Sequence, residues 1–155
     1  ENTCGNIEGR EVEYEPGSSF TGARSDFTLV EGTDHIGEIQ AWDMDTGEEV
    51  WTREFDSHNW GGILTTRGNL LFSGGTTDRF FRAHNASTGE ELWRFRTNSG
   101  IIGVPSTFAV DGKQYVAVQS GWGVDAAGMT GRVDRARGTR TIIPQGGVIW
   151  VFALP

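Results

Sequence analysis

The chain has 155 residues, including 23 Gly, 6 Trp and 9 Phe, and carries a formal net charge of −8. A glycine share about twice the usual one, without a Gly-X-Y period, excludes a collagen-like protein and favours short strands joined by turns. The negative charge argues against nucleic-acid binding, and the absence of about 18 consecutive apolar residues argues against a membrane span.

The first 58 residues begin with Glu1 and contain the only cysteine of the chain, Cys4. One cysteine cannot close an internal disulfide, so Cys4 is either a free thiol or half of a bridge to residues outside this sequence. Because the sequence starts without Met and without a signal peptide, we expect it to be processed, trimmed or part of a longer polypeptide. We interpret residues 1–58 as a long loop followed by two strands.

A sequence motif occurs twice in the middle of the chain, as AWDMDTGEEVW at 41–51 and AHNASTGEELW at 83–93. Gly47 and Gly89 are 42 residues apart, as are Trp51 and Trp93. This period is typical of β-propeller blades, each made of four short strands. In such a motif the Asp or Asn side chain binds the turn backbone and Gly accepts a positive φ. The large Trp ring then packs between neighbouring blades.

The repeat predicts an all-β fold consisting of part of a β-propeller with four-stranded antiparallel blades. Residues 1–58 form the end of one blade, and residues 59–97 form a full blade with strands near 62–65, 69–73, 79–83 and 91–95. Residues 98–155 form the last blade, whose outer strand is missing. Its strands near 106–110, 114–120 and 148–153 are interrupted by an inserted loop at 121–146. We interpret the basic side chains in that insertion as solvated: Arg132, Arg135, Arg137 and Arg140.

Two segments differ from ordinary blade sequence, namely Asn59-Trp60-Gly61-Gly62 and Gly121-Trp122-Gly123. Both Trp residues fall at strand–loop junctions near the expected propeller axis, and glycines beside each would let a flat ring approach the backbone. We therefore consider a planar cofactor site as well as plain packing for these two rings.

Other candidate sites are weaker. The Asp43-x-Asp45-x-Gly47 spacing places the glycine one position too early for a calcium-binding helix–loop–helix. None of His35, His58 and His84 has a partner at zinc-site spacing, so each is expected to be a satisfied surface or turn histidine.

The sequence resembles the PQQ-dependent alcohol dehydrogenases, the quinoprotein methanol and ethanol dehydrogenase family. The resemblance runs over essentially the whole chain and depends on both repeated motifs and three further segments: NWGGILTTRGNLLFSGG, SGIIGVPSTFAVDGKQYVAVQSGWG and GGVIWVFALP. It implies an eight-bladed propeller of which this chain is the C-terminal part, with PQQ on the axis beside calcium or a lanthanide.

The resemblance also implies roles for particular residues. Trp60, Gly121 and Trp122 correspond to residues that contact the cofactor or the substrate cavity, and Cys4 to a cysteine bridged to an upstream residue outside this chain. The metal ligands and the catalytic aspartate of the family lie upstream, so the resemblance assigns no catalytic or metal-binding residue here. Val124-Asp125-Ala126-Ala127 departs from the family pattern after Gly-Trp, which puts the substrate preference in doubt.

The function implied is oxidation of an alcohol, in a periplasmic or secreted enzyme that passes electrons to a c-type cytochrome or another acceptor. The expected partner is the remainder of the propeller, as an upstream segment or a companion chain. Two alternatives are a scaffold propeller with the same repeats, such as an outer-membrane assembly factor, and a WD-type interaction propeller. A scaffold needs the blade tryptophans but not the axial pair Trp60 and Trp122.

Overall fold

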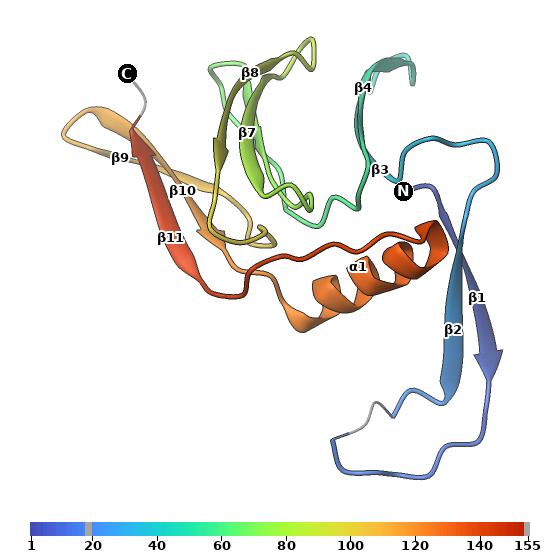
Figure 1. Cartoon of the computed structure of the whole chain (residues 1–155). Coiled ribbons are helices and arrows are strands. Elements are labelled where there is room, and N and C mark those ends of the chain that lie inside the picture. Colours follow the sequence, from blue (N-terminus) through green and yellow to red (C-terminus); the bar gives the residue numbers. More distant parts are fainter. Residues whose placement is uncertain (18–19, 154–155) are drawn as a thin grey trace.

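The computed structural model describes residues 1–17 and 20–153 and shows small antiparallel sheets arranged like a fan (Figure 1). Leu154 and Pro155, which end the GGVIWVFALP segment, lie outside the described residues. Within this range, the structure contains no helix with the length and apolar character that crossing a membrane requires.

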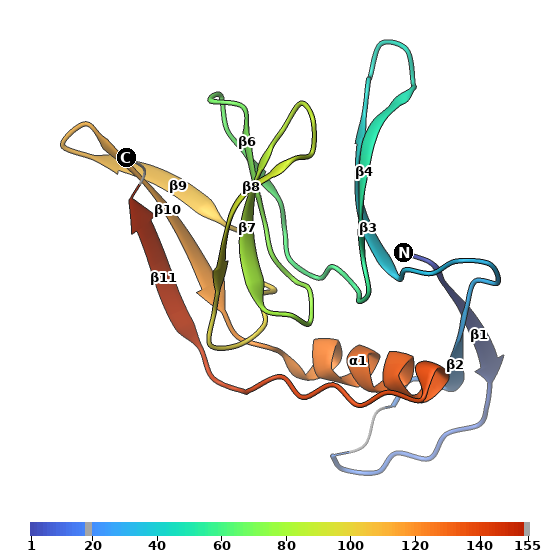
Figure 2. The ribbon, with the colours of Figure 1, turned by 45° about the horizontal axis from the view of Figure 1, so that its top comes forward.

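The middle sheet is a four-stranded antiparallel meander in the order β5-β6-β7-β8. Its strands are β5 (Leu64–Thr65), β6 (Leu70–Ser73), β7 (Phe80–Asn85) and β8 (Glu91–Arg96), close to the four strands predicted from the repeat. On one side lies the hairpin of β3 (Gly37–Trp42) and β4 (Glu49–Phe55). On the other side lie β9 (Ser106–Val110), β10 (Lys113–Ser120) and β11 (Val148–Ala153), as Figure 2 shows.

The repeated motif adopts the same turn in both copies. Asp43 Oδ1 accepts hydrogen bonds from the amides of Asp45 and Thr46, and Asn85 Oδ1 accepts the equivalent pair from Ser87 and Thr88. The glycines that close the turns have φ values of 72° and 70°. This confirms the predicted turn, in which Asp43 and Asn85 bind the turn backbone.

The tryptophan of the first copy joins two neighbouring sheets. The indole of Trp51, on β4, donates to the carbonyl of Ala86 at 3.0 Å, in the turn of the next sheet. Its ring lies so close to Gly89 that a Cβ there would come within 2.7 Å of the ring. Trp51 therefore fills the wedge between sheets, as predicted from the repeat.

The main core lies between the β5–β8 sheet and the β9–β11 sheet. Its buried centre is apolar, and aromatic rings continue it outward: Trp93 and Phe152 have ring centroids 5.1 Å apart. The buried members of the core are as follows: Phe72, Phe81, Ala83, Ile101, Val116 and Val118.

Two regions differ from the predicted loops. The expected long loop before β3 contains the hairpin of β1 (Thr3–Gly9) and β2 (Ala23–Leu29), which projects away from the sheets (Figure 1). The prediction of a loop at 121–146 is wrong over Val124–Arg137, which forms the helix α1. Its buried residues lie on one helical face: Ala126, Thr130 and Val133. Gly128 and Gly131 lower the intrinsic helix propensity of this segment, which is why the sequence did not predict a helix.

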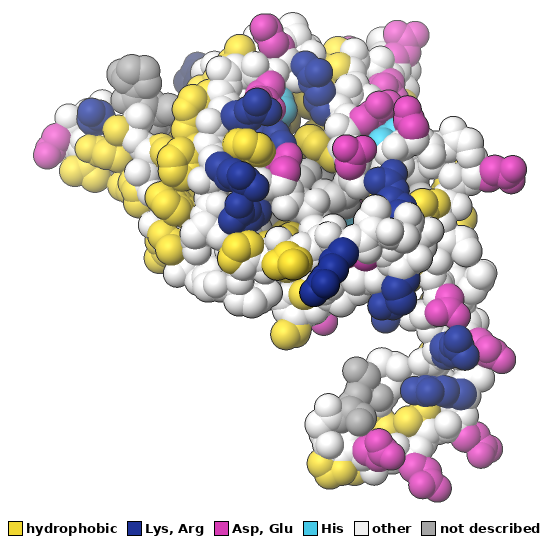
Figure 3. Space-filling model, in the orientation of Figure 1, with side chains coloured by type: hydrophobic (Ala, Val, Ile, Leu, Met, Phe, Trp, Pro, Cys, Tyr) yellow, Lys and Arg dark blue, Asp and Glu magenta, His cyan; other side chains and the backbone are white. Residues whose placement is uncertain are grey.

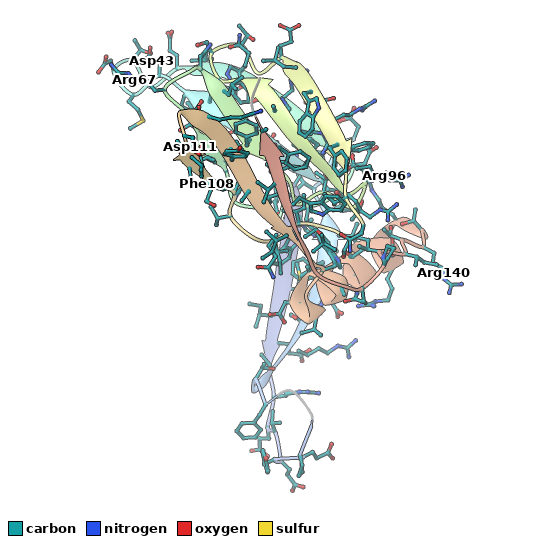
Figure 4. The ribbon with its side chains drawn as sticks, turned by 90° about the vertical axis from the view of Figure 1, so that its left-hand side faces the viewer. Asp43, Arg67, Arg96, Phe108, Asp111 and Arg140 are labelled. Carbon is teal, nitrogen blue, oxygen red and sulfur yellow. The ribbon has the colours of Figure 1, made fainter. Side chains whose placement is uncertain are left out.

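The turn tips and the hairpin lie at opposite ends of the molecule. Figure 4 shows Asp43, Arg67 and Asp111 at the end formed by the strand turns, while β1 and β2 extend from the other end. Helix α1 runs across the end of the sheets that is nearer to the hairpin.

Candidate functional site

The Trp60 segment connects β4 to β5 and packs backbone against backbone on the end of β6. The Trp60 amide donates to the carbonyl of Gly75 at 3.1 Å. A Cβ at Gly61 would lie 2.4 Å from the Gly74 carbonyl oxygen, and one at Gly75 would lie 1.9 Å from the Gly61 nitrogen. Glycine is therefore required at both positions of this contact, which holds Trp60 in the connection four residues before β5.

The Gly121-Trp122 segment follows β10 and leads into α1. The Gly121 amide donates to the carbonyl of Gly100 at 2.7 Å, and the Trp122 side chain is 4% exposed. The indole lies directly on Gly100, where a Cβ would come within 1.9 Å of the ring. The segment borders a cavity of about 570 Å³ whose wall is largely glycine: Ile102, Gly103, Gln119, Gly121, Trp122, Gly123, Gly146 and Gly147.

The two segments are linked through the backbone of the middle sheet. A Cβ at Gly74, beside the Trp60 contact, would meet the side chain of Ile101 at 2.9 Å, and Ile101 follows the Gly100 on which Trp122 rests. Among the aromatic contacts of residues 1–17 and 20–153, the Trp60 ring contacts the His58 ring, with centroids 6.0 Å apart, and not the Trp122 ring. The two segments are thus linked through Gly74, Ile101 and Gly100, and the two indoles do not stack on each other.

Several buried polar atoms of these segments have no hydrogen-bond partner within the described chain: His58 Nε2, Asn59 Oδ1, Trp60 Nε1 and Trp122 Nε1. Leaving a buried polar group unpaired costs about 1–3 kcal/mol, and native proteins seldom tolerate it. Three of the four atoms occur in consecutive residues, and the fourth belongs to the other segment. Their arrangement fits a wall that receives a flat, polar group.

The histidines are predicted to be satisfied surface or turn residues, but His58 and His84 are 2% and 3% exposed, so neither is on the surface, although His84 does lie beside the Asn85 turn. His58 Nδ1 lies 2.8 Å from a carboxylate oxygen of Glu1. His84 Nδ1 lies 3.3 Å from the carbonyl of Gly89, and burial lowers the pKa of the His84 imidazole.

Sequence reasoning also missed a charged cluster around Arg82, on the central strand β7. The guanidinium is buried, pairs with Asp78 and Glu91, and lies 5.5 Å from the ring centroid of Phe55 on β4. Burial alone would raise the pKa of Asp78, but hydrogen bonds from Arg82, Thr76 and Phe80 lower it below its ordinary value. The cluster borders a cavity of about 470 Å³ between the β3–β4 and β5–β8 sheets.

Outside this region, Asp34, His35 and Glu54 bring potential metal-ligand atoms within 4.8 Å of one another. The hydrogen bond from His35 to Asp34 raises the pKa of the imidazole, and Glu38 and Glu54 act in the same direction. The contacts of His35 with the carboxylates of Asp34, Glu38 and Glu54, at 3.1, 3.3 and 3.8 Å, account for this cluster within the chain. Cys4 lies on β1 opposite Thr28, and its thiol is exposed. The predicted bridge from Cys4 stays a prediction.

Comparison with known proteins places this geometry in context. The family model for the glucose/ethanol/alcohol dehydrogenase β-propeller domain that binds PQQ matches residues 52–116. Quinoprotein alcohol dehydrogenase PedH of Pseudomonas putida is 43% identical over 145 residues, covering 93% of this chain and 23% of PedH. Lanthanide-dependent methanol dehydrogenase of Methylorubrum extorquens is 37% identical, covering 98% of this chain and 27% of that protein.

A solved structure agrees with these sequence matches. The europium-containing methanol dehydrogenase superposes with a TM-score of 0.77 and 34% identity over 99% of this chain and 30% of that chain. The chain spans about a quarter of the length of the curated relatives it matches. The sheets described above are therefore β-propeller blades, and the chain belongs to the PQQ-dependent quinoprotein alcohol dehydrogenase family.

Proposed function

We propose that this chain forms part of the cofactor wall and the mouth of the substrate cavity in a longer quinoprotein alcohol dehydrogenase. The enzyme would oxidise an alcohol to an aldehyde or ketone. The proposal depends mainly on the indole nitrogens of Trp60 and Trp122, which are buried without a hydrogen-bond partner among the described residues, and on the glycine-lined cavity beside Trp122. A non-enzymatic scaffold propeller has no need for such a pair.

PQQ, when bound, supplies the acceptor for the hydride of the alcohol, and a calcium or lanthanide ion would increase its electrophilicity as a Lewis acid. The residues of this chain bind, orient and exclude water. Trp122, held on Gly100, would present its ring and its N–H, and Gly121 would allow close approach. Trp60 and Asn59 would offer a donor and an acceptor. The metal ligands and the catalytic base would come from outside this chain.

The rest of the protein enters the proposal as partner. Residues 1–58, 59–97 and 98–155 would contribute the end of one blade, a full blade and the last blade of an eight-bladed ring, of which the remainder comes from other residues of the protein. An exposed Cys4 suits a disulfide with a cysteine elsewhere and a periplasmic or secreted location.

We expect the electron acceptor to be a c-type cytochrome or another acceptor. Two relatives from Thauera butanivorans, 37% and 42% identical, are named 1-butanol dehydrogenases for a quinone and for cytochrome c respectively. Proteins this similar therefore differ in acceptor while sharing a substrate. A c-type cytochrome is the acceptor that we expect first.

The proposal is tested by cofactor binding to the full-length apoprotein. Quenching of tryptophan fluorescence by PQQ is titrated with calcium or lanthanum present, for the wild type, Trp122→Phe and Trp51→Phe. Trp122→Phe removes the indole N–H at the wall, and we expect weaker PQQ binding by about tenfold, the value of one lost hydrogen bond.

Trp51→Phe is the matched control because its indole binds Ala86 between blades. It should lower the stability and leave the PQQ dissociation constant unchanged. Failure of the wild type to bind PQQ, or equal binding by wild type and Trp122→Phe, would contradict the proposal.

A further inference from the structure

Helix α1 connects the two outer sheets of the fan. Its 14 residues span about 21 Å at the usual rise of 1.5 Å per residue. It begins beside the β9–β11 sheet, directly after Gly121-Trp122-Gly123, and it ends near the base of the β3–β4 hairpin (Figures 1 and 2). The helix therefore passes below the middle sheet and connects the β3–β4 sheet to the β9–β11 sheet.

Arg137, the last residue of α1, binds the helix to the β3–β4 hairpin. Its two terminal guanidinium nitrogens donate to the carbonyls of Asp56, at 3.1 Å, and Asp34, at 3.2 Å. Asp34 lies shortly before β3 and Asp56 directly after β4, so one side chain holds both ends of that hairpin. A planar guanidinium can serve two acceptors at fixed angles, which a lysine ammonium on a flexible stem does not reproduce.

The end of the helix from which Arg137 extends is itself fixed. Asp134 accepts hydrogen bonds from the amide of Thr141 at 2.7 Å and from the hydroxyls of Thr139 and Thr141 at 2.8 and 2.9 Å. Burial would raise the pKa of Asp134, but these bonds lower it below its ordinary value, so it stays a carboxylate. Gly138 closes the helix with a φ of 68°. Arg137 thus extends from a rigid helix terminus.

The start of α1 and the Asp56 contact at its other end each lie close in sequence to one of the two tryptophans. Asp56 precedes Trp60 by four residues, and Trp122 precedes the first residue of α1 by two. The Ser57 and His58 side chains between Asp56 and Trp60 are buried, so movement of Asp56 is transmitted along a packed segment. On the basis of the proposed function, we propose that Arg137 is a positioning residue that sets the spacing between the Trp60 and Trp122 walls of the PQQ site.

Arg137 touches neither tryptophan, so its effect on the cofactor would be indirect. Nearby arginines are less suited to this role: Arg135 is exposed, and the Arg132 guanidinium lies 5.2 Å from the ring centroid of Phe27 on β2. Arg135 lies in the same last turn and carries the same charge. It therefore provides a matched control for helix stability and for the loss of one positive charge.

The experiment compares full-length wild type, Arg137→Ala, Arg137→Lys and Arg135→Ala. PQQ binding to each apoprotein is measured by fluorescence quenching, well below the melting temperature of every variant. We expect Arg137→Ala to bind about tenfold more weakly, Arg137→Lys to be intermediate, and Arg135→Ala to match wild type, because each charge-assisted hydrogen bond contributes more than a neutral one.

A second measurement needs no cofactor. Amide hydrogen exchange of the apoprotein should rise in Arg137→Ala in residues 57–62 and 121–124 together, whereas a local role would raise exchange only around 134–141. Unchanged exchange in those two segments, or PQQ binding equal to that of Arg135→Ala, would overturn the positioning role. If Arg137→Ala does not fold, Arg137→Lys decides by the same two readouts. Failure of the wild type itself to bind PQQ would instead overturn the proposed function, and this inference with it.

Discussion

The glycine of the second repeated turn is the sharpest place to test how tryptophan docking joins the blades. Gly89 has a φ of 70°, and a Cβ there would come within 2.7 Å of the Trp51 ring. Gly89→Ala should therefore destabilise the protein in two ways. A left-handed alanine costs about 1–2 kcal/mol, and forcing the indole from its place adds about 1–3 kcal/mol of overpacking.

The backbone contribution can be separated from the steric one. Gly112, at the β9–β10 turn, has a φ of 77° and open space around its Cβ position. Gly112→Ala should therefore cost only the left-handed strain of about 1–2 kcal/mol. In a Trp51→Ala background, Gly89→Ala should fall to the same value, because the ring that it strikes is gone.

The assay is urea unfolding of the full-length protein with the four variants, Gly89→Ala, Gly112→Ala, Trp51→Ala and the double variant. The expected coupling energy between Gly89 and Trp51 is about 1–3 kcal/mol. If Gly89→Ala destabilises no more than Gly112→Ala, and does so regardless of Trp51, then the indole does not dock on this turn and the explanation of the repeat is wrong.

Two further predictions concern the charged wedge between the first two sheets. Arg82→Leu should lower the free energy of unfolding by about 1–3 kcal/mol, which is below the range for a fully buried ion pair because Asp78 and Glu91 are partly exposed. Arg94→Leu, the exposed control, should lower it by less than about 1 kcal/mol. Equal losses for the two variants in urea unfolding would contradict the Arg82 network. Burial lowers the pKa of His84 in the folded protein, so on acidification the imidazole is protonated in the unfolded state before it is protonated in the folded state. The free energy of unfolding should therefore fall as the pH drops through about 6.5 toward 5. The difference in unfolding free energy between wild type and His84→Asn should shrink over that range, and a constant difference would exclude the buried neutral imidazole.

The middle blade could be predicted because its signals are local. The Asn-x-x-Thr-Gly turn specifies its own hydrogen bonds, because the Asn85 side chain accepts from the amides of Ser87 and Thr88. The first copy of the motif behaves identically, down to a shift in strand register at Ala41 that recurs at Ala83. A turn that is specified by its own residues and occurs twice can therefore be predicted from a single sequence.

Helix α1 and the β1–β2 hairpin could not be predicted because tertiary contacts decide them. The helix has a narrow buried stripe and two interior glycines, and only the basic last turn followed by Gly138 marked its end. It is held by contacts with residues over 80 positions away, such as that between Arg137 and Asp56. The buried state of His58 and Arg82 is equally invisible in their sequence neighbourhoods.

The positions of Trp60 and Trp122 were recognised from neighbouring glycines, and the reasons for those glycines emerge only in three dimensions. Gly61 is required because it meets the Gly74 backbone, whereas the ring of Trp122 rests on Gly100, 22 residues earlier in the chain. The glycines next to Trp122 in sequence are therefore not the ones that hold it. The contact with the cofactor itself stays a prediction.

The open faces of the outer sheets lead to a last prediction about the chain expressed alone. The β9–β11 sheet exposes Phe108, Val110, Ile149 and Val151 by 44–71%, and these strands lie at the edge where apolar atoms gather in Figure 3, while Figure 4 shows Phe108 on that side. At the other end of the fan, Trp42 is 51% exposed.

Contiguous apolar faces of this kind are rarely left open on a soluble monomer, and unpaired strand edges favour association. The isolated 155 residues should therefore self-associate or bind the dye ANS strongly in size-exclusion and fluorescence measurements. Ile149→Thr combined with Val151→Thr should reduce both signals because the substitutions lie on the open face. A monomeric peak with a sharp cooperative melt and little dye binding would show that these faces need no neighbouring blade, and the propeller segment would then be stable as a unit.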